Sequence, residues 1–186
     1  MERASAISGD VYATVGENVL SSISTNLRNL MPCTHEEADT RIMVHCRDAV
    51  LKGHASIAIR TVDSDVVCIA VSMYDDIGAD EMWIGFGTGK KFRYIPIHEI
   101  VLSLGPAKSR SLALFHSFTG CDTVSSFCGR GKKVAFEVWN AFPDITETFL
   151  CLGRNPSEVT EDQLSKIERY IVLLYDRTSD IDKVFG

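Results

Sequence analysis

One stretch constrains the possible folds of this chain most, because it sets two tight turns directly before a helix. It runs from Phe118 to Trp139, FTGCDTVSSFCGRGKKVAFEVW. Asp122 lies in a Gly-Cys-Asp turn, and Gly129-Arg130-Gly131 precedes a basic, apolar helix that begins at Lys132. Glycines at a helix start leave backbone N–H groups exposed, and the helix dipole favours an anion there. With Lys132 and Lys133 beside them, they can hold a phosphodiester backbone without reading bases. The alternative is a glycine-rich turn between packed helices, with solvated lysines.

Composition bounds the class of protein. The 186 residues fit about one domain, and a hydrophobic fraction of 45% is enough for a core. No apolar run is long enough to span a bilayer, and the N-terminus lacks a secretory signal, so we expect an intracellular protein with no membrane partner. The six cysteines form no C-x-x-C pair, which favours reduced, buried thiols over zinc ligands. A net charge of −6 argues against a protein that binds nucleic acid through its overall charge. It does not argue against a local cluster of basic residues that does so.

Hydrophobic periodicity predicts a mixed α/β chain. A turn at Gly9-Asp10 can lead into a short strand. Helices are expected over residues 18–30, 34–52, 66–74, 97–104, 106–119, 132–142 and 160–175, and strands over 56–60, 82–86 and 91–95. Between the last two strands, Lys90, Lys91 and Arg93 are interpreted as a solvated edge rather than a phosphate site. His116, just before the Gly-Cys-Asp turn, is interpreted as a core or interface histidine in preference to a catalytic one.

Acidic residues gather at two of these element boundaries. Thr34 and Glu37 form a capping box, and Asp39 adds a further acid to the same helical turn. Asp63 and Asp65 follow the strand over 56–60, at the carboxyl end where α/β sheets bind ligands. A D-x-D at such a turn can set two carboxylates around one divalent ion. The alternatives are that the first group complements the helix dipole, and that Asp63 caps a helix with Asp65 in its first turn.

Taken in chain order, these elements form one pattern. It runs through Glu37-Ala38-Asp39, Asp63-Ser64-Asp65, the Gly-Cys-Asp turn with Asp122, and Gly129-Arg130-Gly131-Lys132-Lys133. Over roughly residues 36–141 the pattern resembles the flap-endonuclease family of structure-specific 5′ nucleases, which carry PIN-like domains. In that family, Glu-Ala-Glu, D-x-D and Gly-Cys-Asp elements supply metal-binding carboxylates. A helix-hairpin-helix with a Gly-Ile-Gly-like turn then holds the DNA backbone.

The resemblance implies a fold. It is an α/β, PIN-like, three-layer domain with a small, mainly parallel sheet, followed by a helix-hairpin-helix and a C-terminal helix. The expected parts form one compact unit: a poorly defined N-terminal segment (1–33), a nuclease core (34–119), the metal-binding turn with the helix-hairpin-helix (120–142), and a C-terminal helical extension (143–186).

The resemblance also implies an activity, namely hydrolysis of phosphodiester bonds in DNA, or less readily RNA, with two Mg²⁺ or Mn²⁺ ions about 4 Å apart. The nucleus is the expected compartment. The implied metal ligands and catalytic residues are Glu37, Asp39, Asp63, Asp65 and Asp122. The implied nucleic-acid contacts are Gly129, Arg130, Gly131, Lys132 and Lys133. Arg41 is expected either at the scissile phosphate or in a surface ion pair.

The chain departs from the family pattern in ways that leave other functions open. Asp39 stands where the family usually has Glu, and the aspartate of the family's first strand has no clear counterpart before Glu36. A missing N-terminal segment or a partner chain would then complete the site. The alternatives are a catalytically incomplete nuclease-like fold that binds nucleic acid or acts as a scaffold, and a phosphatase-like enzyme that uses the same D-x-D.

A second likeness concerns two short stretches, His35–Arg41 (HEEADTR) and Thr119–Thr123 (TGCDT). They are similar to stretches shared by a group of uncharacterised animal proteins derived from mobile elements. This likeness assigns no activity. It implies that the chain is part of a longer reading frame.

Overall fold

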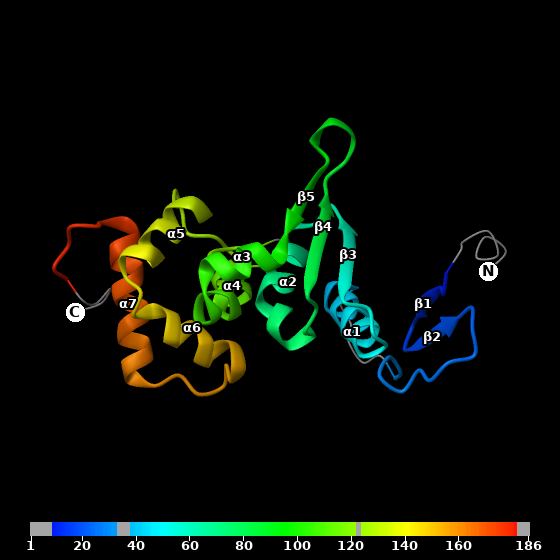
Figure 1. Ribbon diagram of the computed structural model, residues 1–186. Coiled ribbons are helices and arrows are strands. Elements are labelled where there is room, and N and C mark those ends of the chain that lie inside the picture. Colours follow the sequence, from blue (N-terminus) through cyan, green and yellow to red (C-terminus); the bar gives the residue numbers. More distant parts are fainter. Residues whose placement is uncertain (1–8, 33–37, 122–123, 182–186) are drawn as a thin grey trace.

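A three-stranded sheet lies at the centre of the computed structural model, which describes residues 9–32, 38–121 and 124–181 (Figure 1). Its strands are β3 (Ser56–Thr61), β4 (Glu81–Phe86) and β5 (Arg93–Pro96), in the order β3-β4-β5. β3 pairs with β4 in parallel, whereas β4 pairs with β5 antiparallel. The α/β class is therefore confirmed. The sheet is mixed rather than mainly parallel, because the short loop after β4, with a 3-10 turn at Gly89–Lys91, returns the chain as a hairpin.

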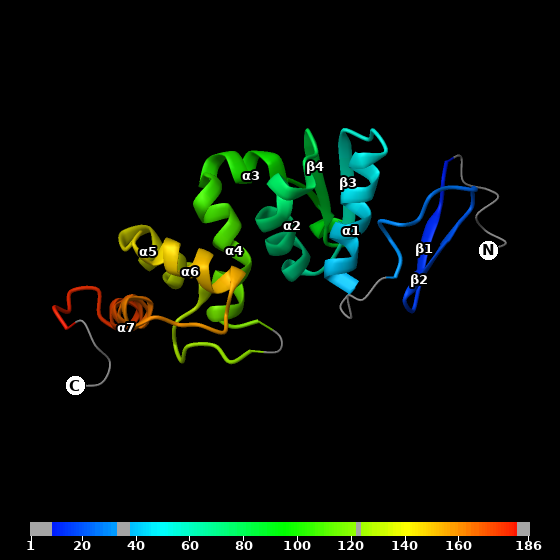
Figure 2. The same cartoon turned by 90° about the horizontal axis from the view of Figure 1, so that it is seen from below.

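Helices cover one face of this sheet. Ile57, Ile59, Met82 and Ile84 alternate with more exposed residues along β3 and β4, and all four are buried. They pack in one hydrophobic cluster with α1 (Ala38–Leu51), α2 (Ser64–Ile77) and α3 (Ile97–Leu104). Figure 2 shows α1 and α2 on the same side of the strands. Among the described residues the sheet region has two layers, so the expected third layer is not seen there.

The C-terminal helices form a second hydrophobic cluster. It contains α4 (Pro106–Phe118), α5 (Lys132–Ala141), α6 (Ile145–Arg154) and α7 (Glu161–Tyr175). Trp139 is fully buried and stacks on Phe115, with ring centroids 4.6 Å apart. Its indole Nε1–H donates to Thr146 Oγ1 at 2.9 Å, and the Tyr170 hydroxyl donates to the Ala135 carbonyl at 2.8 Å. Each polar atom that these large rings bury therefore has a partner.

Most predicted helices and strands are confirmed to within a few residues. α3 spans the predicted residues, and α4 and α5 each end one residue early. The capping box of α7 forms through the Thr160 and Gln163 side chains, as its Thr-x-x-Gln signal predicts. α6 lies in the predicted C-terminal helical extension, although no separate helix was predicted there. None of the helices in the described ranges is long and apolar enough to cross a membrane.

The helix predicted over residues 18–30 is wrong. Strands β1 (Tyr12–Val15) and β2 (Asn18–Ser21) instead form an antiparallel hairpin. Gly16, at the first position of the two-residue loop, has φ 61°, which a tight hairpin needs and glycine adopts most easily. Cross-strand pairing, with Val19 buried, overrides the helical spacing of a few apolar residues. The predicted capping box of Thr34 and Glu37 lies outside the described residues.

The second cluster predicts a large effect of truncating its central ring. Trp139→Ala should lower the free energy of unfolding by about 3–5 kcal/mol, because it leaves a cavity against Phe115. Urea denaturation followed by circular dichroism measures this decrease. The control is Leu102→Ala, at a side chain on α3 that is 85% exposed, which should change stability by less than about 0.5 kcal/mol. Equal effects in the two variants would contradict this packing.

Candidate functional site

The acidic turn after β3 begins α2. Asp63 is the N-cap residue, and its Oδ1 accepts a hydrogen bond from the backbone N–H of Asp65 at 2.9 Å. The Asp63 N–H in turn donates to Thr61 Oγ1 at 3.0 Å. Both aspartates therefore lie at the carboxyl end of β3, as predicted. The capping role that was the alternative for Asp63 is also present, so one carboxylate oxygen of Asp63 is already used by the helix.

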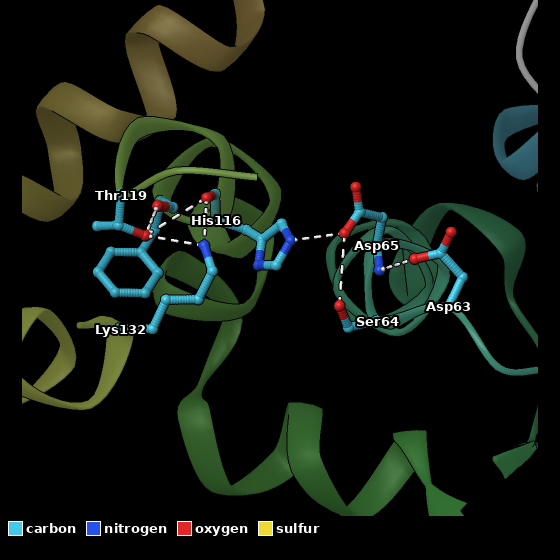
Figure 3. Close-up of polar contacts among 7 residues, drawn as sticks. Asp63, Ser64, Asp65, His116, Thr119 and Lys132 are labelled. Carbon is cyan, nitrogen blue, oxygen red and sulfur yellow. Dashed lines mark hydrogen bonds and ion pairs between the residues drawn. The ribbon is translucent and has the colours of Figure 1, made fainter. Parts of the chain in front are cut away.

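A hydrogen bond joins this turn to the end of α4 (Figure 3). His116 Nε2 donates to Asp65 Oδ1 at 2.8 Å, and the Ser64 hydroxyl approaches the same oxygen at 3.5 Å. His116 is only 8% exposed, whereas Asp65 is half-buried. His116 is thus buried between α4 and α2, as expected for a core or interface histidine. Its partner is an acid of the predicted site, so His116 fixes the direction in which the Asp65 carboxylate points.

Lys132 lies on the other side of His116. Its Nζ donates to the His116 carbonyl at 2.6 Å and to Thr119 Oγ1 at 3.1 Å (Figure 3). A cation at the carbonyl end of a helix is favourable, and here it holds the start of α5 against the end of α4. Burial lowers the pKa of Lys132, while nearby Cys68, Cys121 and Asp65 act in the opposite direction. The ammonium therefore lies near both Asp65 and the Gly-Cys-Asp turn, and points inward.

The Gly-Cys-Asp turn follows α4 almost directly. Gly120 has φ 99°, and a Cβ there would lie 2.7 Å from Ser126 Cα, so glycine is required. The Val124 N–H donates to the Cys121 carbonyl at 3.1 Å, which closes the turn. Asp122, like Glu37, lies outside the described residues. The flanks of the turn nevertheless show that it begins two residues after α4, beside the helix end that Lys132 and His116 hold.

The predicted metal ligands are only partly assembled in the described part of the chain. Asp63 and Asp65 lie together at the start of α2, and Asp39 is in the first turn of α1. Residues 9–32, 38–121 and 124–181 contain no group of three or more His, Cys, Asp or Glu side chains placed to hold a metal ion. Two of the five predicted ligands, Glu37 and Asp122, lie outside these ranges.

The predicted phosphate contacts divide into two groups. Gly131 is the N-cap of α5 and provides no side-chain cap, and Gly129 has φ 69°, so the glycine turn is formed as predicted. Lys133 is exposed at the first turn of α5. Arg130, however, donates to the Tyr175 carbonyl at 2.9 Å, and its guanidinium lies 5.3 Å from the centre of that ring. It binds the end of α7, so it does not extend into solvent as a phosphate contact would.

Two further predictions meet a similar outcome. Arg41 Nη1 donates to the Gly16 carbonyl of the N-terminal hairpin at 3.0 Å, so Arg41 contacts another part of the chain. Only the second helix of the predicted helix-hairpin-helix is seen in the described residues, because 119–121 and 124–131 contain no helix. The residue that sequence reasoning undervalued is His116. Its one local signal was its place just before the Gly-Cys-Asp turn.

Comparisons with known proteins identify no relative. No protein-family model, curated protein or solved structure matches the chain.

The capping role of Asp63 predicts a specific pattern of stability. Asp63→Ala should lower the free energy of unfolding by about 1 kcal/mol, because it leaves the Asp65 N–H without its acceptor. Asp63→Asn should retain almost all of the stability, since the amide oxygen can accept the same hydrogen bond. Urea denaturation of both variants measures the difference. If Asp63→Asn were destabilised as much as Asp63→Ala, charge rather than capping would explain the decrease.

Two thiols packed among the helices of the sheet half predict a pH dependence. Burial raises the pKa of Cys68, on α2, and of Cys46, on α1, from an ordinary value of 9.0 to about 11. Between pH 9 and pH 11, these two thiols are therefore more often protonated in the folded state than in the unfolded chain. This contribution to stability is complete below pH 9 and disappears as the pH rises towards 11.

Thiol reactivity provides the measurement, because the thiolate is the reactive form. Mass spectrometry after brief iodoacetamide treatment at about pH 8.5, near the ordinary thiol pKa, should find the exposed Cys128 labelled before Cys46 and Cys68. Labelling of Cys68 at the rate of Cys128 would contradict the burial of this thiol.

Proposed function

We propose that the chain is a divalent-metal-dependent nuclease that hydrolyses phosphodiester bonds in nucleic acid, DNA in preference to RNA. The observation that carries this proposal is the 2.8 Å hydrogen bond between His116 and Asp65. It brings the acidic turn after β3 to the end of α4, and the Gly-Cys-Asp turn begins there. In this proposal, Asp122 adds a carboxylate to those of Asp63 and Asp65 near this edge of the sheet. The nucleus is the proposed compartment.

The carboxylates present fit a hard divalent cation. Within the described residues, the Oδ2 atoms of Asp63 and Asp65 accept no hydrogen bond, so each aspartate has an oxygen available as a ligand. Oxygen ligands of this kind are preferred by Mg²⁺ and Mn²⁺. Asp122 follows on the neighbouring turn, and Glu37 and Asp39 complete the proposed set. Such an ion, when bound, activates a water molecule and stabilises the leaving oxygen.

The other residues of the site have positioning roles in this proposal. His116 orients the Asp65 carboxylate, and the capping bond of Asp63 holds the turn in place. Lys132 fixes α5 against the end of α4, and thereby places the glycine turn. Lys133 and the backbone N–H groups near Gly131 are left to hold a phosphate. Arg130 and Arg41 are given no role in phosphate binding, because backbone carbonyls already engage them.

The activity predicts the effect of a conservative substitution. Asp63→Asn should reduce Mn²⁺-dependent cleavage of a labelled, branched DNA by at least about a hundredfold, because a metal-binding carboxylate becomes a neutral amide. The fold should survive, since Asn also caps the helix. The matched control is Asp76→Asn, an exposed aspartate on the same helix, which should cleave at the wild-type rate. Undiminished cleavage by a folded Asp63→Asn protein would refute the assignment.

A second candidate is a nuclease-like fold that binds nucleic acid without cleaving it. One observation favours it: Arg41, the residue expected at the scissile phosphate, donates to the Gly16 carbonyl. Calorimetric titration with Mn²⁺ separates the candidates. Binding of one or two ions that Asp63→Asn/Asp65→Asn abolishes supports the nuclease. A folded wild-type protein that binds no Mn²⁺, yet retains salt-sensitive DNA binding in EDTA, supports the second candidate.

A further inference from the structure

The face of the sheet turned away from the helices carries aromatic and basic side chains. The strand register places Ala58, Trp83 and Pro96 in one row, and Arg60, Gly85 and Tyr94 in the next. These rows alternate with the buried ones, so they belong to the opposite face. Tyr94 is 65% exposed and the adjoining Phe92 is 38% exposed. We call the side chains of Arg60, Trp83, Phe92 and Tyr94 the aromatic face.

The aromatic face is held in a fixed arrangement. A Cβ at Gly85 would lie 3.2 Å from the Phe92 ring, so the absence of a side chain there lets the ring lie over the strand. The Arg60 guanidinium stands 4.9 Å from the centre of the Phe92 ring, and it donates to the Gly85 carbonyl at 2.8 Å and to the Gly87 carbonyl at 2.5 Å. Tyr94 meets Phe92 edge-on, with centroids 5.0 Å apart. These contacts place the rings before any ligand arrives.

Trp83 extends this surface along β4. Its Nε1–H donates to Glu81 Oε2 at 3.3 Å, and its ring meets His98 edge-on with centroids 5.1 Å apart. His98 is itself fixed, since its Nδ1 lies 3.1 Å from the Met82 carbonyl. The aromatic face therefore has two anchored groups of rings, one around Phe92 and Tyr94 and the other around Trp83.

The charge around this surface differs from that of the whole chain. Residues 82–98 contain no Asp or Glu, whereas the chain has a net charge of −6. The same stretch contributes Lys90, Lys91 and Arg93, all exposed. The loop that carries the two lysines projects from the sheet, clear of the helices (Figure 1). Glu81 lies at the Trp83 end of the aromatic face, whereas cations border the rings of Phe92 and Tyr94. Exposed rings bordered by cations match a polyanion that also offers flat, apolar surfaces.

We propose that the aromatic face binds single-stranded nucleic acid, with bases stacked on Tyr94 and Phe92 and phosphates held by Lys90 and Lys91. Aromatic stacking suits a single strand because its bases are not hidden in a duplex, and every base has a π-face. Arg60 adds a planar cation to the same surface. The lysines, interpreted from the sequence alone as a solvated edge, thereby acquire a function. This site lies on different residues from the acidic turn and requires no metal.

The two sites share an edge of the sheet. Thr61, two residues before Asp63, pairs with Phe86 at the end of β4, and the lysine loop follows Phe86. A single strand on the aromatic face can therefore extend towards the acidic turn. The binding site nevertheless stands without the proposed nuclease activity, because its residues hold no part of the metal site.

Fluorescence anisotropy tests the proposal with labelled oligo-dT and oligo-U of about 15 nucleotides, which is long enough for one such site. The buffer contains EDTA, so that metal-dependent cleavage plays no part. Tyr94→Ala should weaken binding by about 5- to 100-fold, whereas Tyr94→Phe should keep wild-type affinity because it keeps the ring. Lys90→Gln/Lys91→Gln should make the slope of log affinity against log salt shallower by about 1.4, because each lysine that neutralises a phosphate contributes roughly 0.7. Comparison of oligo-U with oligo-dU, which differ only in the 2′-hydroxyl, shows whether this group contributes.

Matched controls separate this site from the rest of the surface. Arg28→Gln/Arg154→Gln removes two exposed charges elsewhere on the surface. This variant should keep the salt slope of the wild type, and its affinity should decrease only slightly and equally for both oligonucleotides. Because this assay measures binding in EDTA, a failed nuclease assay leaves its result intact. The proposal is overturned if Tyr94→Ala binds normally, if a duplex of the same length binds as tightly, or if the wild type binds neither strand. In the last case the aromatic face would be a protein interface.

Discussion

Close packing between α2 and α4 holds the two halves of the structure together. The Ser72 hydroxyl on α2 accepts a hydrogen bond from the Ala113 N–H on α4 at 2.8 Å, and it donates to the Cys68 carbonyl at 3.0 Å. Small side chains at this crossing allow the two backbones to approach. Leu112 packs against both hydrophobic clusters, so α4 belongs to the sheet half and to the helical half at once.

The candidate site lies on this same contact between the helices. Asp65 is on α2 and His116 on α4, so their hydrogen bond spans the boundary between the clusters. Thr119 and Lys132 continue the polar contacts along the end of α4. Buried polar groups are costly without partners, so each member of this chain of contacts depends on the others. A geometry fixed in this way specifies one arrangement of α2 against α4, as apolar contacts alone would not.

Local signals explain how much of the structure can be predicted from the sequence. α3, α4, α5 and α7 have clear caps, breakers or apolar periodicity, and their limits follow from neighbouring residues.

The N-terminal hairpin was mispredicted because helical spacing over few apolar residues competes poorly with a glycine turn and cross-strand pairing. Asp63 has two interpretations from the sequence, and the structure shows the capping one. The long-range contacts explain what could not be predicted: His116 and Asp65 are 51 residues apart in sequence, and neither has a local signal that names the other. The exposure of Phe92 and Tyr94 has no local signal either, since it depends on which face of the sheet the helices cover.

The acid-free stretch over residues 82–98 has a kinetic consequence for an otherwise acidic molecule. A polyanion approaching most of the surface meets repulsion, whereas the projecting β4–β5 loop attracts it. Orientation is therefore selected during diffusional encounter, before any ring or phosphate is in contact. At physiological ionic strength the Debye length is about 8 Å, so this selection acts only over the last nanometre of approach. The overall negative charge therefore restricts the position at which a polyanion first contacts the protein, and does not only lower its affinity.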